Sequence, residues 1–156
     1  KSQSPLDEID LSFNNISNLE LNIFHVIKFN LNKNNLRYFE NSSFVTDDHS
    51  ETTLKTNHFV EFPTFFIRNK IVMKLLDLSE NNIEILRNLN NSDYKIQYDK
   101  AIRLNYFYLK KNNLKKIEQN SILSRFIFLT HLDLSENEIT DFNNTFEYIF
   151  RLEYLN

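Results

Sequence analysis

One hexapeptide occurs twice in this chain, and its surroundings recur from end to end. Leu-Asp-Leu-Ser-Glu-Asn occupies residues 76–81 and 132–137. A template with apolar residues at positions one, four, six and eleven and asparagine at nine aligns six segments and the start of a seventh. Their first residues are Leu6, Val26, His49, Met73, Leu104, Leu129 and Leu152. The third segment is a weaker copy, because His49 and Thr52 occupy positions one and four. Such a period predicts stacked units rather than one globular core.

Each unit predicts one short strand, because apolar positions four and six alternate with polar neighbours as in a strand with one buried face. Successive units begin 20 to 31 residues apart. One strand cannot bury its apolar side alone, so the units must stack into a parallel sheet. We therefore expect an α/β solenoid over 1–156 with the sheet on its concave face and irregular or short helical segments on its convex face.

The asparagine at position nine predicts a structural ladder. Backbone groups are left inside the coil where the chain turns out of each strand, and an amide side chain can both donate to and accept from them. The ladder residues are Asn14, Asn34, Asn57, Asn81, Asn112 and Asn137.

A second set of apolar residues, many of them phenylalanine, follows each motif, and we interpret it as core. The first part of the set lies three residues past position eleven: Leu19, Phe39, Phe62, Leu86, Ile117 and Phe142. The second part lies further along: Phe24, Phe44, Phe66, Ile122 and Phe146. The longer polar stretch 87–100 predicts an insertion or extended loop on the convex side.

The whole chain resembles the leucine-rich repeat superfamily. Residues 34–44, Asn-Asn-Leu-Arg-Tyr-Phe-Glu-Asn-Ser-Ser-Phe, and 137–146, Asn-Glu-Ile-Thr-Asp-Phe-Asn-Asn-Thr-Phe, are similar to the typical animal subfamily found in Toll-like receptor ectodomains. The resemblance implies recognition of a protein or other macromolecule, often with homo- or heterodimerisation, and no catalysis. Because the chain opens close to one motif and ends within another, we expect it to be the interior of a longer array whose ends are capped elsewhere.

Composition excludes several other classes. The net charge of −3 is small and mixed, so neither nucleic acid nor an anionic membrane is an expected partner. No apolar run is long enough to cross a membrane. The chain holds no cysteine and no glycine, hence no thiolate ligand and no glycine-rich phosphate loop. We expect no enzyme activity, no cofactor and no metal.

Two arrangements offer alternatives to that expectation. His131, Asp133 and Ser135 alternate along one strand and suggest a metal or hydrolytic site, although the repeat itself supplies the aspartate and serine, as at Asp77 and Ser79. The acidic pairs in 77–80 and 133–136 suggest calcium, but calcium requires about six to eight converging oxygens.

The concave face carries template positions three, five, seven and eight, which are free to vary. One region of it is rich in tyrosine and charge, a composition typical of interface hot spots. Its residues are Tyr106, Tyr108, Lys110, Lys111, Asp77, Glu80, His131 and Asp133, and Leu75 adjoins them. We predict that a partner binds here; the alternative is that tyrosine simply suits an exposed strand.

Four N-glycosylation sequons begin at Asn15, Asn41, Asn90 and Asn143. They fit a secreted protein, although chance produces such triplets in an asparagine-rich chain. The preferred interpretation is an extracellular or cell-surface recognition module. The alternatives are a cytoplasmic scaffold of the same fold, of phosphatase-regulatory or cytoskeletal adaptor type, and an enzyme that uses this array as a binding arm.

Overall fold

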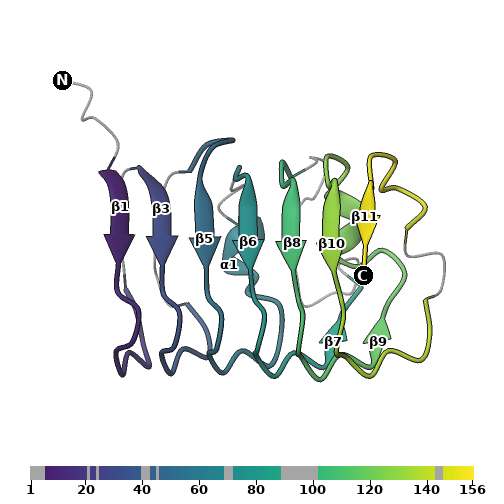
Figure 1. Cartoon of the computed structure of the whole chain (residues 1–156), viewed down its shortest axis with the longest axis horizontal. Helices are drawn as coiled ribbons and strands as arrows, with labels where there is room; N and C mark the ends of the chain where they lie inside the picture. Colours follow the sequence, from purple (N-terminus) through teal and green to yellow (C-terminus); the bar gives the residue numbers. More distant parts are fainter. Residues whose placement is uncertain are drawn as a thin grey trace.

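The structure, a computed structural model, describes residues 6–20, 22–23, 25–39, 43–44, 46–68, 72–88, 102–142 and 146–156. These residues form a solenoid of parallel strands with very little helix (Figure 1). The expected insertion, apart from its first two residues, and the sequons at Asn41, Asn90 and Asn143 lie outside the described residues, as does Phe24.

A single seven-stranded sheet runs along the solenoid, and its strands lie side by side in chain order (Figure 1). The strands are β1 (Leu6–Asp10), β3 (Val26–Asn30), β5 (Glu51–Thr53), β6 (Leu75–Asp77), β8 (Tyr106–Tyr108), β10 (His131–Asp133) and β11 (Tyr154–Leu155). Every pairing is parallel, as the repeat predicts.

The register of the sheet follows the template. Glu8 pairs with Lys28, Lys28 with Glu51, and Glu51 with Leu75, all of them position-three residues. In the three-residue strands β5, β6, β8 and β10 the middle residue is buried and its neighbours are half-buried. Positions three and five therefore share one side of the sheet, which we call the solvent face together with the neighbouring positions seven and eight.

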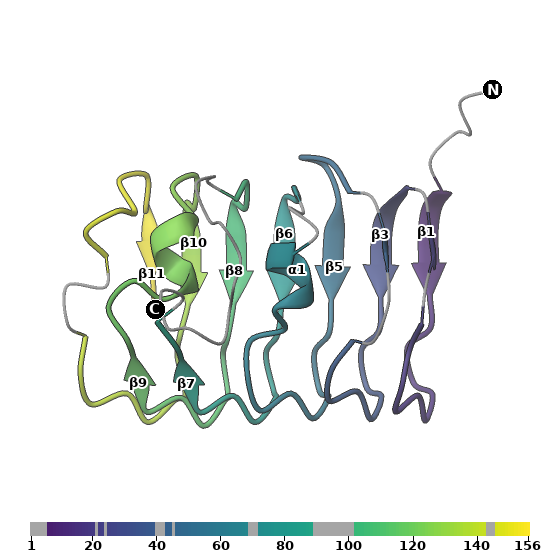
Figure 2. The ribbon, with the colours of Figure 1, turned by 180° about the vertical axis from the view of Figure 1, so that it is seen from behind.

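Smaller elements complete each coil behind and below the main sheet. They are the paired strands β2 (Asn22–Ile23) and β4 (Ser43–Phe44), the paired strands β7 (Ile85–Leu86) and β9 (Lys116–Ile117), the helix α1 (Phe65–Arg68) and the 3₁₀ helix η1 (Ile122–Arg125). Seen from behind, α1 lies over β6 (Figure 2). These short elements leave the solvent face of the sheet uncovered.

The core lies between the sheet and this back layer, and template positions four, six and eleven fill most of it. Fully buried examples are Phe29, Leu54 and Ile83. Phenylalanines of the back layer join them: the Phe62 ring meets the rings of Phe107 and Phe126 with centroids 5.9 and 6.4 Å apart. Aromatic pairs at these separations add to the stabilisation from burial.

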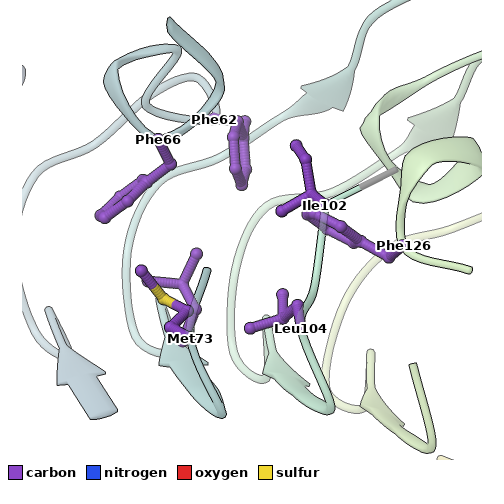
Figure 3. Close-up of a pocket in the computed structure, with 7 residues that line it drawn as sticks. Phe62, Phe66, Met73, Ile102, Leu104 and Phe126 are labelled. Atoms are coloured by element: carbon purple, nitrogen blue, oxygen red, sulfur yellow. The ribbon is translucent and has the colours of Figure 1, made fainter. Parts of the chain in front are cut away.

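A small cavity of about 10 Å³ remains in this core (Figure 3). The described residues that line it are all apolar: Phe62, Phe66, Met73, Leu76, Ile102, Leu104 and Phe126. A space of this size and lining offers no polar partner to a bound water, so it is a packing defect and not a chemical site.

The asparagines of the ladder connect successive coils. Asn81 Nδ2 donates to the carbonyl oxygens of Leu54 and Leu78, each at 3.0 Å, and its Oδ1 accepts the Phe59 N–H at 3.1 Å. Asn34, Asn57, Asn112 and Asn137 make the same kinds of bond, each to its own coil and to the preceding one. Asn14, in the first unit, bonds within its own turn, donating to the Leu11 and Ser12 carbonyls, and to no other coil among the described residues.

Among the described residues, four positions of the expected core are exposed instead, namely Leu6, His49, Phe142 and Leu155. Leu6, Phe142 and Leu155 are 51%, 48% and 50% exposed. In the weak third unit His49 points to solvent and the next residue, Ser50, is buried instead. The Ser50 hydroxyl donates to the Val26 carbonyl at 2.9 Å, so a polar contact replaces an apolar one there.

Among the described residues, no helix is long and apolar enough to cross a membrane.

Candidate interaction surface on the solvent face

The loops that follow the strands have a backbone conformation that the sequence did not reveal. Position eight is left-handed in all six complete units, with φ between 53° and 57° at Phe13, Lys33, Thr56, Glu80, Lys111 and Glu136. Glycine usually occupies this region, and this chain has none. The strained turn places position eight beside position seven, at the edge of the solvent face where the strands end.

The aspartates at position five also shape this turn. Oδ1 of Asp77 accepts the Ser79 N–H at 2.8 Å, and Oδ1 of Asp133 accepts the Ser135 N–H at 2.9 Å. Asp10 makes the same bond to Ser12 at 2.8 Å. This is an Asx-turn, in which a short side chain satisfies a backbone donor two residues on. These aspartates therefore have a structural role in addition to any role in binding.

Tyr106 and its neighbours form a stack of flat rings across three strands. Tyr106 pairs in register with His131, which pairs with Tyr154. The ring centroids are 4.6 Å apart for Tyr106 and His131 and 5.7 Å apart for His131 and Tyr154. The Lys74 ammonium lies 6.0 Å from the Tyr106 centroid. Sequence reasoning placed Tyr106 and His131 here but missed Tyr154, which is position three of the seventh unit.

Tyr108 lies between two carboxylates. It pairs in register with Asp77 on one side and Asp133 on the other. Burial raises the pKa of its phenol, and the nearby Tyr106, Asp77 and Asp133 raise it further. Tyr106 and Tyr108 are half-buried rather than freely exposed, because their neighbours in register cover part of each ring.

The remaining charges of the region pair with one another. Glu136 accepts from Lys110 at 3.0 Å and lies 3.6 Å from Lys111. Glu80 lies 3.3 Å from Lys55 and accepts the Thr56 hydroxyl at 3.0 Å. Lys110, Lys111 and Glu80 of the predicted surface are therefore already held in ion pairs in the folded chain.

These pairs shift the pKa of their members in the directions expected of ion pairs. The bond from Lys110 lowers the pKa of Glu136, and the bonds from Thr56 and Lys55 lower that of Glu80. The Glu136 carboxylate in turn raises the pKa of Lys110. These directions keep Glu80, Glu136 and Lys110 charged at neutral pH.

The geometry does not bring His131, Asp133 and Ser135 together as a relay. The His131 ring Nδ1 lies 3.0 Å from the Thr130 hydroxyl, and the ring stacks on tyrosines. Asp133 accepts the backbone N–H of Ser135 rather than a histidine N–H. A hydrolytic site requires a base oriented by an acid and bonded to a nucleophile. The contacts of His131 and Asp133 do not form that arrangement.

A second polar group lies at the start of β5 and was not singled out from the sequence. Asp47 Oδ2 is 3.0 Å from His25 Nε2, and Asp47 Oδ1 accepts the His49 N–H at 2.9 Å. Potential ligand atoms of Asp47, Asp48 and His49 lie within 4.8 Å of one another. Burial opposes the charge on Asp47, but the bonds from His49, Ser50 and His25 prevail and lower its pKa. These contacts account for the loop geometry without a metal.

The comparisons with known proteins support the fold. No protein-family model matches this sequence, and no curated protein matches it. Among solved structures, the chain is similar to one in the complex of Toll with Spätzle from Drosophila, in its glycosylated form. The TM-score is 0.61 at 16% identity, over 97% of this chain and 25% of that chain. This chain thus spans about a quarter of the length of the protein it resembles, and the likeness concerns architecture alone.

Proposed function

We propose that this chain is a non-catalytic recognition module of the leucine-rich repeat type, curved so that the solvent face of the sheet is concave. In this proposal it belongs to an extracellular or cell-surface receptor of Toll-like type and binds a protein ligand through the solvent face. The likeness to a chain of the Toll–Spätzle complex supports a receptor-like solenoid. The single observation that carries the choice of surface is the ring stack of Tyr106, His131 and Tyr154, with Tyr108 beside it.

Rings on a sheet suit protein recognition for a physical reason. The parallel hydrogen bonds fix the backbone, and stacking fixes the rings, so binding immobilises few additional side chains. Tyrosine offers a large apolar area together with a hydroxyl, which is why it dominates interface hot spots. The ion pairs around the rings would form a charged rim that excludes water.

The test is binding of the chain to an array of purified extracellular proteins. Tyr106→Ser combined with Tyr108→Ser should weaken any specific interaction by about tenfold or more, as truncation of hot-spot residues does. Tyr38→Ser is the matched control, since Tyr38 is 52% exposed and lies outside the solvent face. Binding that the double variant leaves unchanged would contradict the proposed surface.

A further inference from the structure

We propose that Tyr108, Asp77 and Asp133 form an acceptor site for one arginine side chain of the protein ligand. This inference rests on the proposed function, because it takes the solvent face to be the binding surface. It goes beyond that function by stating which chemistry the ligand must present and where.

The arrangement is set by the register of three neighbouring strands. Asp77, Tyr108 and Asp133 face each other in β6, β8 and β10, so the tyrosine ring has a carboxylate on each side. Neighbouring strands are about 4.8 Å apart, which places each carboxylate within reach of a flat cation lying over the ring. A guanidinium both stacks on an aromatic ring and forms paired hydrogen bonds to a carboxylate.

Asp77 and Asp133 have no ion-pair partner on the solvent face among the described residues. Among the described residues, the lysines of this region each have a glutamate: Lys74 bonds Glu51 at 3.0 Å, and Lys55 and Lys110 bond Glu80 and Glu136. Neither Asp77 nor Asp133 lies within 4.0 Å of a lysine or arginine nitrogen in an ion pair between described residues. A ligand cation would supply the missing partner.

Lys110 is the competing cation nearby. Asp133 contributes to the raised pKa of Lys110, but Glu136 is the larger cause and holds the ammonium at 3.0 Å. A ligand cation therefore does not have to displace Lys110 from Asp133 in order to bind. Only one oxygen of each aspartate is used by the turn, so the other can accept from a guanidinium.

Arginine fits this site better than lysine does. Tyr108 is half-buried between its neighbours, and a cation that lies over it loses part of its water shell. Guanidinium is more weakly hydrated than ammonium and is planar, so it loses less and stacks better. A sugar could also stack on these tyrosines, but it would gain little from two unpaired carboxylates.

The test uses a random peptide library selected on the full chain, with variants that keep the fold. Asp77→Asn and Asp133→Asn retain the oxygen that accepts the turn N–H, and Asn30 already does so at the same template position, accepting from Asn32 at 3.1 Å. Asp10→Asn is the matched control: Asp10 has the same turn, but its register partner is Asn30, not tyrosine.

We expect the selected peptides to be enriched in arginine and to lose about tenfold or more in affinity when both Asp77 and Asp133 become asparagine. Asp10→Asn should leave their affinity unchanged, and replacing arginine in the peptide by citrulline should match the loss. Peptides that need Tyr106 and Tyr108 but not the aspartates would overturn the arginine site and leave the proposed function intact. Peptides insensitive to all these changes, or a glycan that binds through the tyrosines where no peptide does, would overturn both.

Discussion

At the scale of single residues, the unusual feature of this chain is the use of ordinary side chains where glycine is expected. Six residues at template position eight are left-handed, and a Cβ atom in that region costs about 1–2 kcal/mol per residue. Thr56 is the least suited of them, because its branched Cβ crowds the backbone further. The turn is nevertheless kept, since the asparagine ladder and the parallel strands fix the chain on both sides of it.

We therefore expect Thr56→Gly to raise the free energy of unfolding by about 0.5–1 kcal/mol, despite the greater freedom of glycine in the unfolded chain and the lost bond to Glu80. Thr53→Gly, three residues earlier in strand β5, should lower it by about 1 kcal/mol, since glycine weakens a strand. Urea titration followed by circular dichroism measures both. If both variants changed the free energy of unfolding in the same direction, this account of the turn would be contradicted.

At the scale of elements, strand β5 belongs to the unit that departs most from the template. Its unit has Thr52 where the others have isoleucine, leucine or phenylalanine, and His49 where most have an apolar residue. Thr52 is 1% exposed, and its hydroxyl has no hydrogen-bond partner among the residues that the structure describes. A buried hydroxyl without a partner costs free energy that the packing of its methyl group only partly offsets.

Thr52→Val should accordingly raise the free energy of unfolding by about 1–2 kcal/mol, because valine keeps the shape and removes the unpaired hydroxyl. Thr53→Val tests the reason: the Thr53 hydroxyl donates to Asn30 Oδ1 at 3.2 Å on the solvent face, so its loss should give no gain. The measurement is the midpoint of unfolding in urea. If both variants gained equally, β-propensity and not the buried hydroxyl would be the cause.

At the scale of the whole molecule, carboxylate side chains stabilise the array through hydrogen bonds within a turn and through bonds and ion pairs between neighbouring coils. Within the described part of the chain, five carboxyl groups have a pKa below the ordinary value: Asp10, Asp47, Glu80, Glu118 and Glu136. Glu118 illustrates the cause, since it accepts the backbone N–H of Asn88 at 2.8 Å. The array is stabilised by these charges only while they remain ionised.

Stability should consequently fall in acid. A carboxyl whose folded pKa lies below its unfolded value of about 4 stabilises the fold above that value and loses the contribution as pH falls through the folded pKa. We expect the urea midpoint to be level from about pH 5 to pH 8 and to decline between about pH 5 and pH 3. Glu80→Gln should make this decline shallower than Glu84→Gln, a change at an exposed glutamate of the same unit. If the urea midpoint declined equally steeply in acid for the two variants, a stabilising role for the Glu80 carboxylate would be contradicted.

The sequence correctly predicted which residues of the candidate surface lie next to each other on neighbouring strands. The template assigns Tyr106, Tyr108 and His131 to neighbouring strands, and the structure pairs those strands in that register. The template also aligns Asp77 with Tyr108, as the structure does. That a partner binds these residues, that the chain has no catalytic role and that Asn15 carries a glycan all stay predictions.

The amino-acid sequence by itself determined the parallel solenoid, its register and most of its core, because those depend on a repeated pattern that each unit contains. Only the tertiary structure decided which charges pair, which rings stack and which template positions turn outward. Those outcomes depend on a neighbouring coil 20 or more residues away, as in the bond between Glu80 and Lys55 or the bond from the Ser50 hydroxyl to the Val26 carbonyl. A local pattern contains no information on such neighbours, so the chemistry of the solvent face had to be taken from the folded array.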